Sequence, residues 1–148
     1  MLKSVIKCIK KVIAITLVAG IMVQMPQGIV EAQAAQKESN YIVYNEEINE
    51  TFTFTTIEWG QTLVMRIPTC MEMDFSYSEG NWYEVYYANV AVNEESVTVN
   101  NNAATVTNLS YRVSGDGAFR RISVEAQPVY LYISCDEWGM EYGAYLEE

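Results

Sequence analysis

The sequence contains no histidine. Without an imidazole, the chain cannot build a histidine-assisted serine or cysteine triad, a histidine-ligated zinc site or imidazole acid–base catalysis. It also lacks the G-x-S-x-G nucleophile motif, the glycine-rich phosphate loop and the dinucleotide-binding fingerprint. Carboxylates are therefore the only abundant side chains with which this chain could perform catalysis.

Basic residues are scarce, and four of the nine lie within residues 1–11, where there is no acidic residue. The apolar run 12–23 follows, and then Ala32–Ala34 in an A-x-A arrangement. A basic start, an apolar run too short to span a bilayer and small residues at this place are typical of a secretory signal peptide. We expect residues 1–34 to be cleaved on export, with retention as an anchor as the alternative, and residues 35–40 to form a polar linker. The long lysine-rich start favours a Gram-positive bacterium.

The part of the chain expected outside the cell is strongly acidic. Residues 35–148 hold five basic residues against eighteen acidic ones, a net charge of −13. Binding of nucleic acid depends on basic residues that neutralise phosphates, so nucleic acid is excluded as a partner, and the same charge repels anionic lipid. We expect a secreted, extracellular protein that meets a membrane only during export.

Two cysteines, Cys70 and Cys135, remain after the predicted cleavage. In an oxidising exterior they could form a disulfide that stabilises the fold by about 4 kcal/mol. However, Cys135 continues the apolar face of residues 129–133, whereas Cys70 is out of step with the apolar face of residues 71–75. Two unpaired cysteines are therefore an equally good interpretation.

Apolar and polar residues alternate with a period of two along most of residues 41–148. The predicted strands cover residues 41–44, 51–57, 62–67, 71–77, 82–92, 96–100, 105–114, 118–126, 129–135 and 140–146. Pro68 is expected to end a strand or to mark an edge. About nine short strands with turns every eight to twelve residues predict an all-β fold, an antiparallel β-sandwich of jelly-roll-like type, as a single domain over residues 41–148.

Motifs near both ends of this domain resemble those of bacterial pre-peptidase C-terminal domains. An F-x-F and a G-Q-x-L motif occur at residues 52–54 and 60–63, and an Asp-Phe pair follows at residues 74–75. Residues 129–134 and 139–146 resemble the aromatic hairpin that closes the family's domains. The resemblance implies a jelly-roll-like sandwich, an accessory role beside secreted hydrolases and calcium bound by acidic loops.

Two pairs of carboxylates are candidates for chemistry. Glu72 and Asp74 share one strand face, and Asp136 and Glu137 lie in a turn beside Trp138. A glycosidase needs two carboxyl groups that flank a sugar, so a small glycan hydrolase is an alternative function. Asp136 and Glu137 could instead bind calcium, although their spacing does not match an EF-hand. An ordinary solvated strand face and an ordinary turn are the simpler interpretation, and no other cofactor is expected.

All eleven tyrosines lie beyond residue 40. Tyr130 and Tyr132 alternate with aliphatic residues, so if the aliphatic side chains form the core, these two tyrosines point outward. With Tyr145 and Trp138 they would form an exposed aromatic face suited to binding, because tyrosine offers a large contact area with few rotatable bonds. Tyrosine standing in for leucine in a partly solvated sheet is the alternative.

These features predict a non-catalytic binding or accessory domain, not an enzyme, that recognises an extracellular protein or polysaccharide through a tyrosine-rich sheet face. The glycan hydrolase and a self-assembling cell-surface structural protein are the alternative functions.

Overall fold

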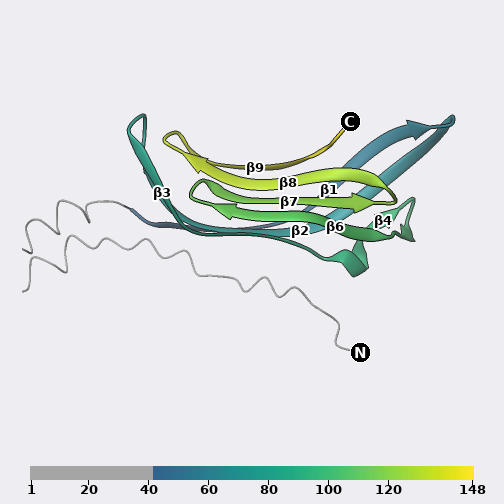
Figure 1. Cartoon of the computed structure of the whole chain (residues 1–148), viewed down its shortest axis with the longest axis horizontal. Coiled ribbons are helices and arrows are strands. Elements are labelled where there is room, and N and C mark those ends of the chain that lie inside the picture. Colours follow the sequence, from purple (N-terminus) through teal and green to yellow (C-terminus); the bar gives the residue numbers. More distant parts are fainter. Residues whose placement is uncertain (1–41) are drawn as a thin grey trace, which may run out of the picture.

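The computed structural model describes residues 42–148, which form nine β-strands in two antiparallel sheets and contain no α-helix (Figure 1). The strands and one short 3-10 helix are β1 (Tyr44–Glu58), β2 (Gln61–Ser78), β3 (Trp82–Val92), η1 (Glu94–Ser96), β4 (Thr98–Val99), β5 (Asn102–Ala103), β6 (Val106–Ser114), β7 (Gly117–Val124), β8 (Gln127–Asp136) and β9 (Gly139–Leu146). The predicted all-β sandwich is confirmed. The predicted signal peptide (1–34) and linker (35–40) lie outside the described residues, and no helix within 42–148 is long and apolar enough to cross a membrane.

Each sheet is built from strands that follow one another along the chain. Sheet A has β1 on one side of β2, while β3 and the short β4–β5 pair share the other side. Sheet B has the order β6-β7-β8-β9. These hairpin connections are those of two meanders, whereas a jelly roll contains two Greek keys. The predicted jelly-roll-like connectivity is therefore not observed.

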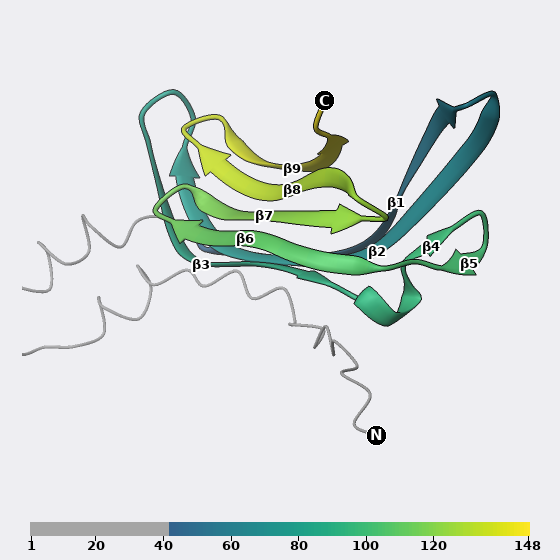
Figure 2. The same ribbon diagram turned by 45° about the vertical axis from the view of Figure 1, so that its right-hand side comes forward.

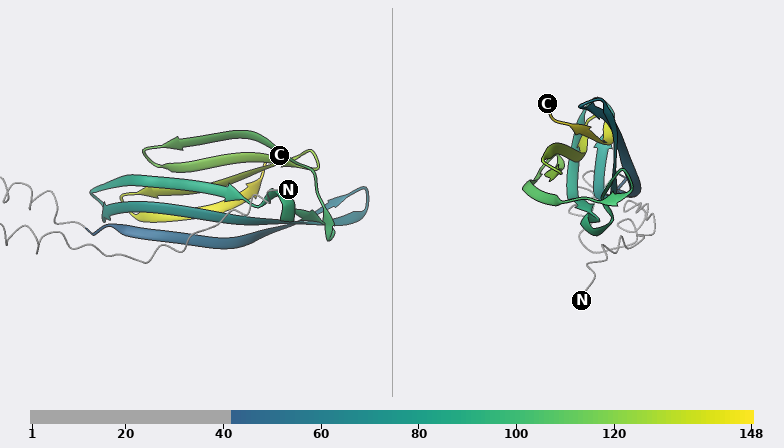
Figure 3. Two further views of the ribbon diagram at one scale, coloured as in Figure 1. Left: turned by 90° about the horizontal axis from the view of Figure 1, so that it is seen from below. Right: turned by 90° about the vertical axis from the view of Figure 1, so that its right-hand side faces the viewer.

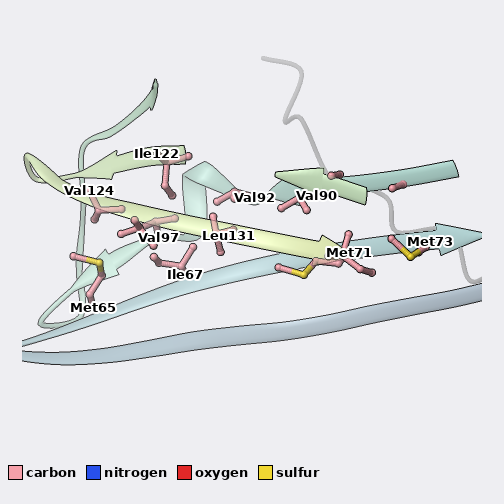
Figure 4. Close-up of a cluster of buried hydrophobic side chains, with 14 of the residues drawn as sticks. Met65, Ile67, Met71, Met73, Val90, Val92, Val97, Ile122, Val124 and Leu131 are labelled. Carbon is pink, nitrogen blue, oxygen red and sulfur yellow. The ribbon is translucent and has the colours of Figure 1, made fainter. Parts of the chain in front are cut away.

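The core lies between the two sheets, where β3 packs across β7 and β8. Alternate residues of the long strands point into this space because successive side chains of a strand face opposite sides (Figure 4). Apart from Ser76, the largest fully buried side chains are aliphatic or sulfur-containing, and all but Val97, which precedes β4, come from the strands of the two sheets: Ile67, Met71, Met73, Val90, Val97, Ile122, Val124, Val129, Leu131 and Ile133.

Strands β1 and β2 are longer than predicted, because each joins two of the predicted strands. Pro68 lies inside β2, opposite Thr51, and does not end it. Glu58 and Gln61 close a two-residue turn and form a hydrogen-bonded pair. Because hydrogen-bonded and non-hydrogen-bonded pairs alternate along an antiparallel ladder, Thr51 and Pro68 form a non-hydrogen-bonded pair. The nitrogen and the carbonyl of Pro68 therefore point away from β1, into the gap between the end of β3 and the start of β4. There the carbonyl of Pro68 accepts a hydrogen bond from the N–H of Asn93 (3.0 Å). The missing N–H of proline removes no ladder bond there.

Two turns differ from the sequence-based expectation. Glu125 and Ala126, both with left-handed backbone (φ +48° and +69°), form the two-residue turn between β7 and β8. Such turns usually carry asparagine or glycine, so nothing in these two residues predicted an end to the strand at 124. The predicted strand 96–100 is reduced to β4, because Asn100 and Asn101 (φ +50° and +64°) turn the chain into β5.

The far end of the β1–β2 hairpin projects past the strands of sheet B (Figures 2 and 3). We call residues 51–64 the hairpin ribbon. Its tip is the turn Trp59–Gly60, in which both residues have positive φ (+53° and +76°). Asn100 supports the ribbon from the side: its N–H donates to the carbonyl of Val64 (2.9 Å), and its Oδ1 accepts from the N–H of Val64 (2.8 Å).

The predicted alternative of a Cys70–Cys135 disulfide is wrong, because Cys135 is a free, buried thiol. The N–H of Cys135 donates to the carbonyl of Asp116 (2.8 Å), and the carboxylate of Asp116 accepts a hydrogen bond from Tyr83. Tyr83 pairs with Tyr77, seven residues along β2 from Cys70. Seven residues of strand span about 23 Å, whereas the Cα atoms of a disulfide lie roughly 6 Å apart.

Candidate functional site

The outer face of sheet B carries one cluster of aromatic and arginine side chains. It holds six residues from all four strands, and we call them the aromatic face: Arg112, Phe119, Arg121, Tyr130, Tyr132 and Tyr145. On β7 and β8, the residues of the aromatic face alternate with the buried Ala118, Ile122 and Leu131, so they point away from the core. Arg112 and Tyr145 lie directly opposite such residues on the neighbouring strands and therefore point to the same side. The predicted outward orientation of the tyrosines is therefore what the structure shows.

Tyr130 is the centre of the aromatic face. Its ring centroid lies 5.0 Å from that of Tyr145 across the strand pair, 6.2 Å from that of Tyr132 along β8 and 6.3 Å from that of Phe119 on β7. These separations fall within the range of favourable aromatic contacts. Four rings from three strands therefore form one continuous surface, and Tyr145 at its edge is 48% exposed.

A glycine shapes how Tyr132 lies on the sheet. Gly143 is directly opposite Tyr132 in the β8–β9 pair, and a Cβ atom at this position would come within 3.0–3.2 Å of the tyrosine ring and hydroxyl. Because Gly143 has no side chain, the ring can lie against the backbone of β9. This packing of an aromatic side chain over a strand glycine turns the opposite face of the ring towards solvent.

The two arginines of the aromatic face are held differently. Arg121 donates from Nε and Nη2 to both carboxylate oxygens of Glu147 (2.9 and 2.5 Å), and this hydrogen bonding lowers the pKa of Glu147. The guanidinium of Arg112 instead lies 4.4 Å from the centroid of the Phe119 ring. No carboxylate among residues 42–148 pairs with it. Stacking thus fixes the position of Arg112 while its N–H donors stay available.

Small and polar residues border the aromatic face along the strands. On one side lie Thr107, Ser123 and Pro128, and on the other lie Ser134 and Glu141, which are hydrogen-bonded to each other (3.4 Å). An aromatic centre with a polar border is the usual composition of a protein binding surface. Desolvation raises the pKa of Tyr145, and Tyr130 and Glu147 nearby raise it further, so the hydroxyl of Tyr145 is a neutral donor at pH 7.

Trp138 does not join the aromatic face, although the sequence analysis grouped it with Tyr130, Tyr132 and Tyr145. It is exposed in the β8–β9 turn, where its indole ring lies against Gly80 of the β2–β3 turn. Four residues of β8, about 13 Å of strand, separate Tyr132 from Asp136 at the start of this turn. The tryptophan therefore belongs to the end of the sandwich.

The predicted calcium ligands have structural roles in the same turn. Oδ1 of Asp136 accepts a hydrogen bond from the N–H of Trp138 (2.7 Å), and the carbonyl of Glu137 accepts one from the N–H of Gly80 (3.0 Å). Within residues 42–148, no three acidic, cysteine or histidine side chains come together as metal ligands. Calcium binding by Asp136 and Glu137 stays a prediction.

Glu72 and Asp74, the predicted carboxylate pair, lie on the outer face of sheet A. Oε2 of Glu72 accepts hydrogen bonds from Tyr87 (3.2 Å) and Asn89 (3.4 Å), and Oδ1 of Asp74 accepts one from Asn45 (2.8 Å). Desolvation and the charge of Glu72 raise the pKa of Tyr87. A cavity of about 250 Å³ in the same sheet is lined by neither carboxylate.

Sequence reasoning missed three members of the aromatic face, Arg112, Phe119 and Arg121. The signal that could have found Arg112 and Phe119 is the gap at residues 115–117 between the predicted strands 105–114 and 118–126, which the structure shows to be a turn at Gly115–Asp116. Counting back from its closing pair of Ser114 and Gly117 places Arg112 opposite Phe119. The pairing with β8, which brings these residues beside the tyrosines, is a tertiary feature.

Comparisons with protein-family models, curated proteins and solved structures found no match for this chain. The resemblance to pre-peptidase C-terminal domains therefore stays a prediction, and a functional proposal depends on the chemistry of the aromatic face.

Proposed function

We propose that this protein is a secreted, non-catalytic binding domain that recognises an extracellular polysaccharide through the aromatic face of sheet B. The observation that carries the proposal is the continuous surface of four rings centred on Tyr130, none of which belongs to the core. The accessory role implied by the resemblance to pre-peptidase C-terminal domains is part of the same proposal.

The packing of the rings supports stacking on sugars. Tyrosine and phenylalanine have only two rotatable side-chain bonds, and contact with neighbouring rings and with Gly143 limits them further. Little conformational entropy is then lost when a flat, apolar sugar face settles on the rings. The tyrosine hydroxyls and the N–H donors of Arg112 can bond to sugar hydroxyl groups.

The charges of the aromatic face support an uncharged or weakly charged ligand. Arg121 and Glu147 neutralise each other, and Arg112 adds one positive charge. The outer face of sheet A, by contrast, presents Glu72 and Asp74 in a chain with a net charge of −10. The aromatic face is thus a surface of this acidic protein on which a sugar polymer meets no excess of carboxylates.

Calorimetric titration with a panel of neutral and acidic polysaccharides tests the proposal. We expect the protein to bind at least one of them and Tyr130→Ala to weaken that binding at least tenfold, because centrally placed aromatic residues contribute most of the affinity of an interface. Tyr86→Ala, which removes an exposed tyrosine from sheet A, is the matched control and should bind within about twofold of the unchanged protein.

Three results would contradict the proposal. These are the absence of binding across the panel, equal affinity of Tyr130→Ala and the unchanged protein, and release of reducing sugar from a bound polysaccharide. The last result, if Glu72→Gln abolished it, would favour the glycan hydrolase. Capture of a protein partner that Tyr130→Ala releases would replace the polysaccharide as the ligand.

A further inference from the structure

The hairpin ribbon has an open backbone edge. β1 lies at the side of sheet A and, among the strands of residues 42–148, pairs with β2 only. Because Glu58 and Gln61 form the hydrogen-bonded pair that closes the turn, even-numbered residues of the ribbon bond to β2. The N–H and C=O groups of the odd-numbered residues point to the other side: Thr51, Thr53, Thr55 and Ile57. Within residues 42–148 no strand pairs with them there.

Residues 51–57 of this edge lack the features that protect the edge of β6. Residues 51–57, Thr-Phe-Thr-Phe-Thr-Thr-Ile, contain no charge, no proline and no glycine. The pairing of β1 with β2 also runs through this stretch without a bulge. By comparison, the edge strand β6 has a register shift at Leu109 and carries Arg112. Long, uncharged edges rich in β-branched and aromatic residues pair readily with another chain.

The tip of the ribbon exposes large apolar side chains beside the open edge. Trp59 is fully exposed and Ile57 is 76% exposed. Trp59 also has a left-handed backbone (φ +53°), as the two-residue turn requires, although asparagine or glycine adopts it more readily. The turn therefore presents a large apolar side chain to solvent beside the open edge.

We propose that the hairpin ribbon is a homodimerisation edge, on which β1 pairs antiparallel with β1 of a second copy around a two-fold axis at Thr55. The occupant is a second copy because the open edge is complementary to itself. Ile57 then lies opposite Thr53, and Phe54 opposite Thr56, with all matched side chains on the same face. The result is a continuous sheet of β2-β1 from one copy and β1-β2 from the other.

Charge and shape select this register. With the axis at Phe54, Glu58 would face Glu50 of the second copy, whereas with the axis at Thr55 it faces Phe52. Like charges directly opposite each other destabilise a strand pair. The axis at Thr55 also places Trp59 opposite Thr51, which lines the cavity of about 250 Å³ together with Asn49, Pro68 and Asn93. In such a dimer, the exposed indole of each copy would lie beside this cavity of the other.

Sedimentation equilibrium of the purified full chain over a wide range of concentrations tests the dimer. Thr55→Pro removes the N–H at the two-fold axis, but it leaves the β1–β2 ladder intact because Thr55 and Val64 form a non-hydrogen-bonded pair. We expect the dimer dissociation constant of Thr55→Pro to rise at least tenfold. Thr55→Val keeps the N–H and the β-branched side chain, so it should dimerise like the unchanged protein.

Thr55→Lys is a second variant for the case that proline disturbs the ribbon. It places two like charges at the axis on an exposed position, so it should also be monomeric while its circular dichroism and thermal unfolding stay unchanged. A monomeric unchanged protein at all concentrations, or dimers of Thr55→Pro and Thr55→Lys with unchanged affinity, would overturn the inference. Polysaccharide binding is independent of it, because the ribbon and the aromatic face share no residue.

Discussion

At the scale of single residues, Cys135 shows how burial alone sets chemistry. The thiol is buried at the end of β8, and this desolvation, with a contribution from the charge of Asp136, raises its pKa from the ordinary value of 9.0 to about 11. Only the thiolate is a nucleophile, so Cys135 is unreactive at neutral pH despite being free. The residue is part of the core.

The shifted pKa of Cys135 predicts a loss of stability at alkaline pH. Because the folded protein holds this proton more tightly than the unfolded chain does, the contribution is complete below about pH 9 and is lost as the pH rises towards 11. We expect about 1 kcal/mol, less than the full shift would give, since solvent screens part of the effect. Urea unfolding between pH 8 and 11 should show a shallower decline for Cys135→Ala than for the unchanged protein. Parallel declines would contradict this explanation.

At the scale of elements, Asn100 connects the β4–β5 turn to the hairpin ribbon. Besides its two bonds to Val64, its Nδ2 donates to the carbonyl of Thr62 (3.3 Å). An isolated two-stranded hairpin is only marginally stable in water, so a projecting ribbon needs such lateral support. The left-handed backbone of Asn100 is what allows its side chain and main chain to bond to the same strand.

Removing this support should loosen the ribbon. We expect Asn100→Ala to destabilise the protein by about 2 kcal/mol, since it loses two side-chain hydrogen bonds and strains a left-handed position. Asn100→Gly relieves the strain and should cost about 1 kcal/mol. Hydrogen exchange checks the mechanism: the amide of Val64 should exchange faster in both variants, while core amides such as that of Leu131 change only with global stability. Unchanged exchange at Val64 would show that Asn100 does not support the ribbon.

Two turns that contain glycine were predictable. The hairpin turns at Trp59–Gly60 and Gly115–Asp116 fall in the gaps that the predicted strands left at residues 58–61 and 115–117, where glycine permits a tight turn. The Glu125–Ala126 turn and the inclusion of Pro68 in β2 were not predictable. Both depend on neighbours distant in sequence: the N–H of Thr105 donates to Glu125 (2.6 Å), and a gap between two strands accommodates the proline.

At the scale of the whole molecule, β8 connects the stability of the sandwich to the proposed binding surface. Val129, Leu131 and Ile133 of β8 are fully buried between the sheets, and its tyrosines cover the outer face. Neighbouring residues of one strand thus serve separate purposes, because a strand presents successive side chains to opposite sides.

Substitutions at neighbouring residues of β8 should affect either the stability of the fold or the binding of polysaccharide. Leu131→Ala should lower the free energy of unfolding by about 3 kcal/mol, because it leaves a cavity in the core. Tyr132→Ala should cost about 1 kcal/mol or less in stability, since the ring contacts only neighbours on the surface. Chemical unfolding measures both, and the polysaccharide titration should show the reverse order of effects. Comparable losses of stability would contradict the two-sided role of β8.

The sequence by itself determined the all-β sandwich, the outward direction of Tyr130, Tyr132 and Tyr145 and the exclusion of histidine chemistry. These follow from alternation and composition, which act within one strand. Only the tertiary structure decided which strands lie side by side. The observed pairing gives two meanders and not the predicted jelly-roll-like connectivity. It also separates Cys70 from Cys135 and places Trp138 away from the tyrosines. It also brought Arg112 and Phe119 to the aromatic face and left one edge of β1 open. Strand pairing depends on contacts between residues distant in sequence, and the alternation of apolar and polar residues within one strand does not predict these contacts.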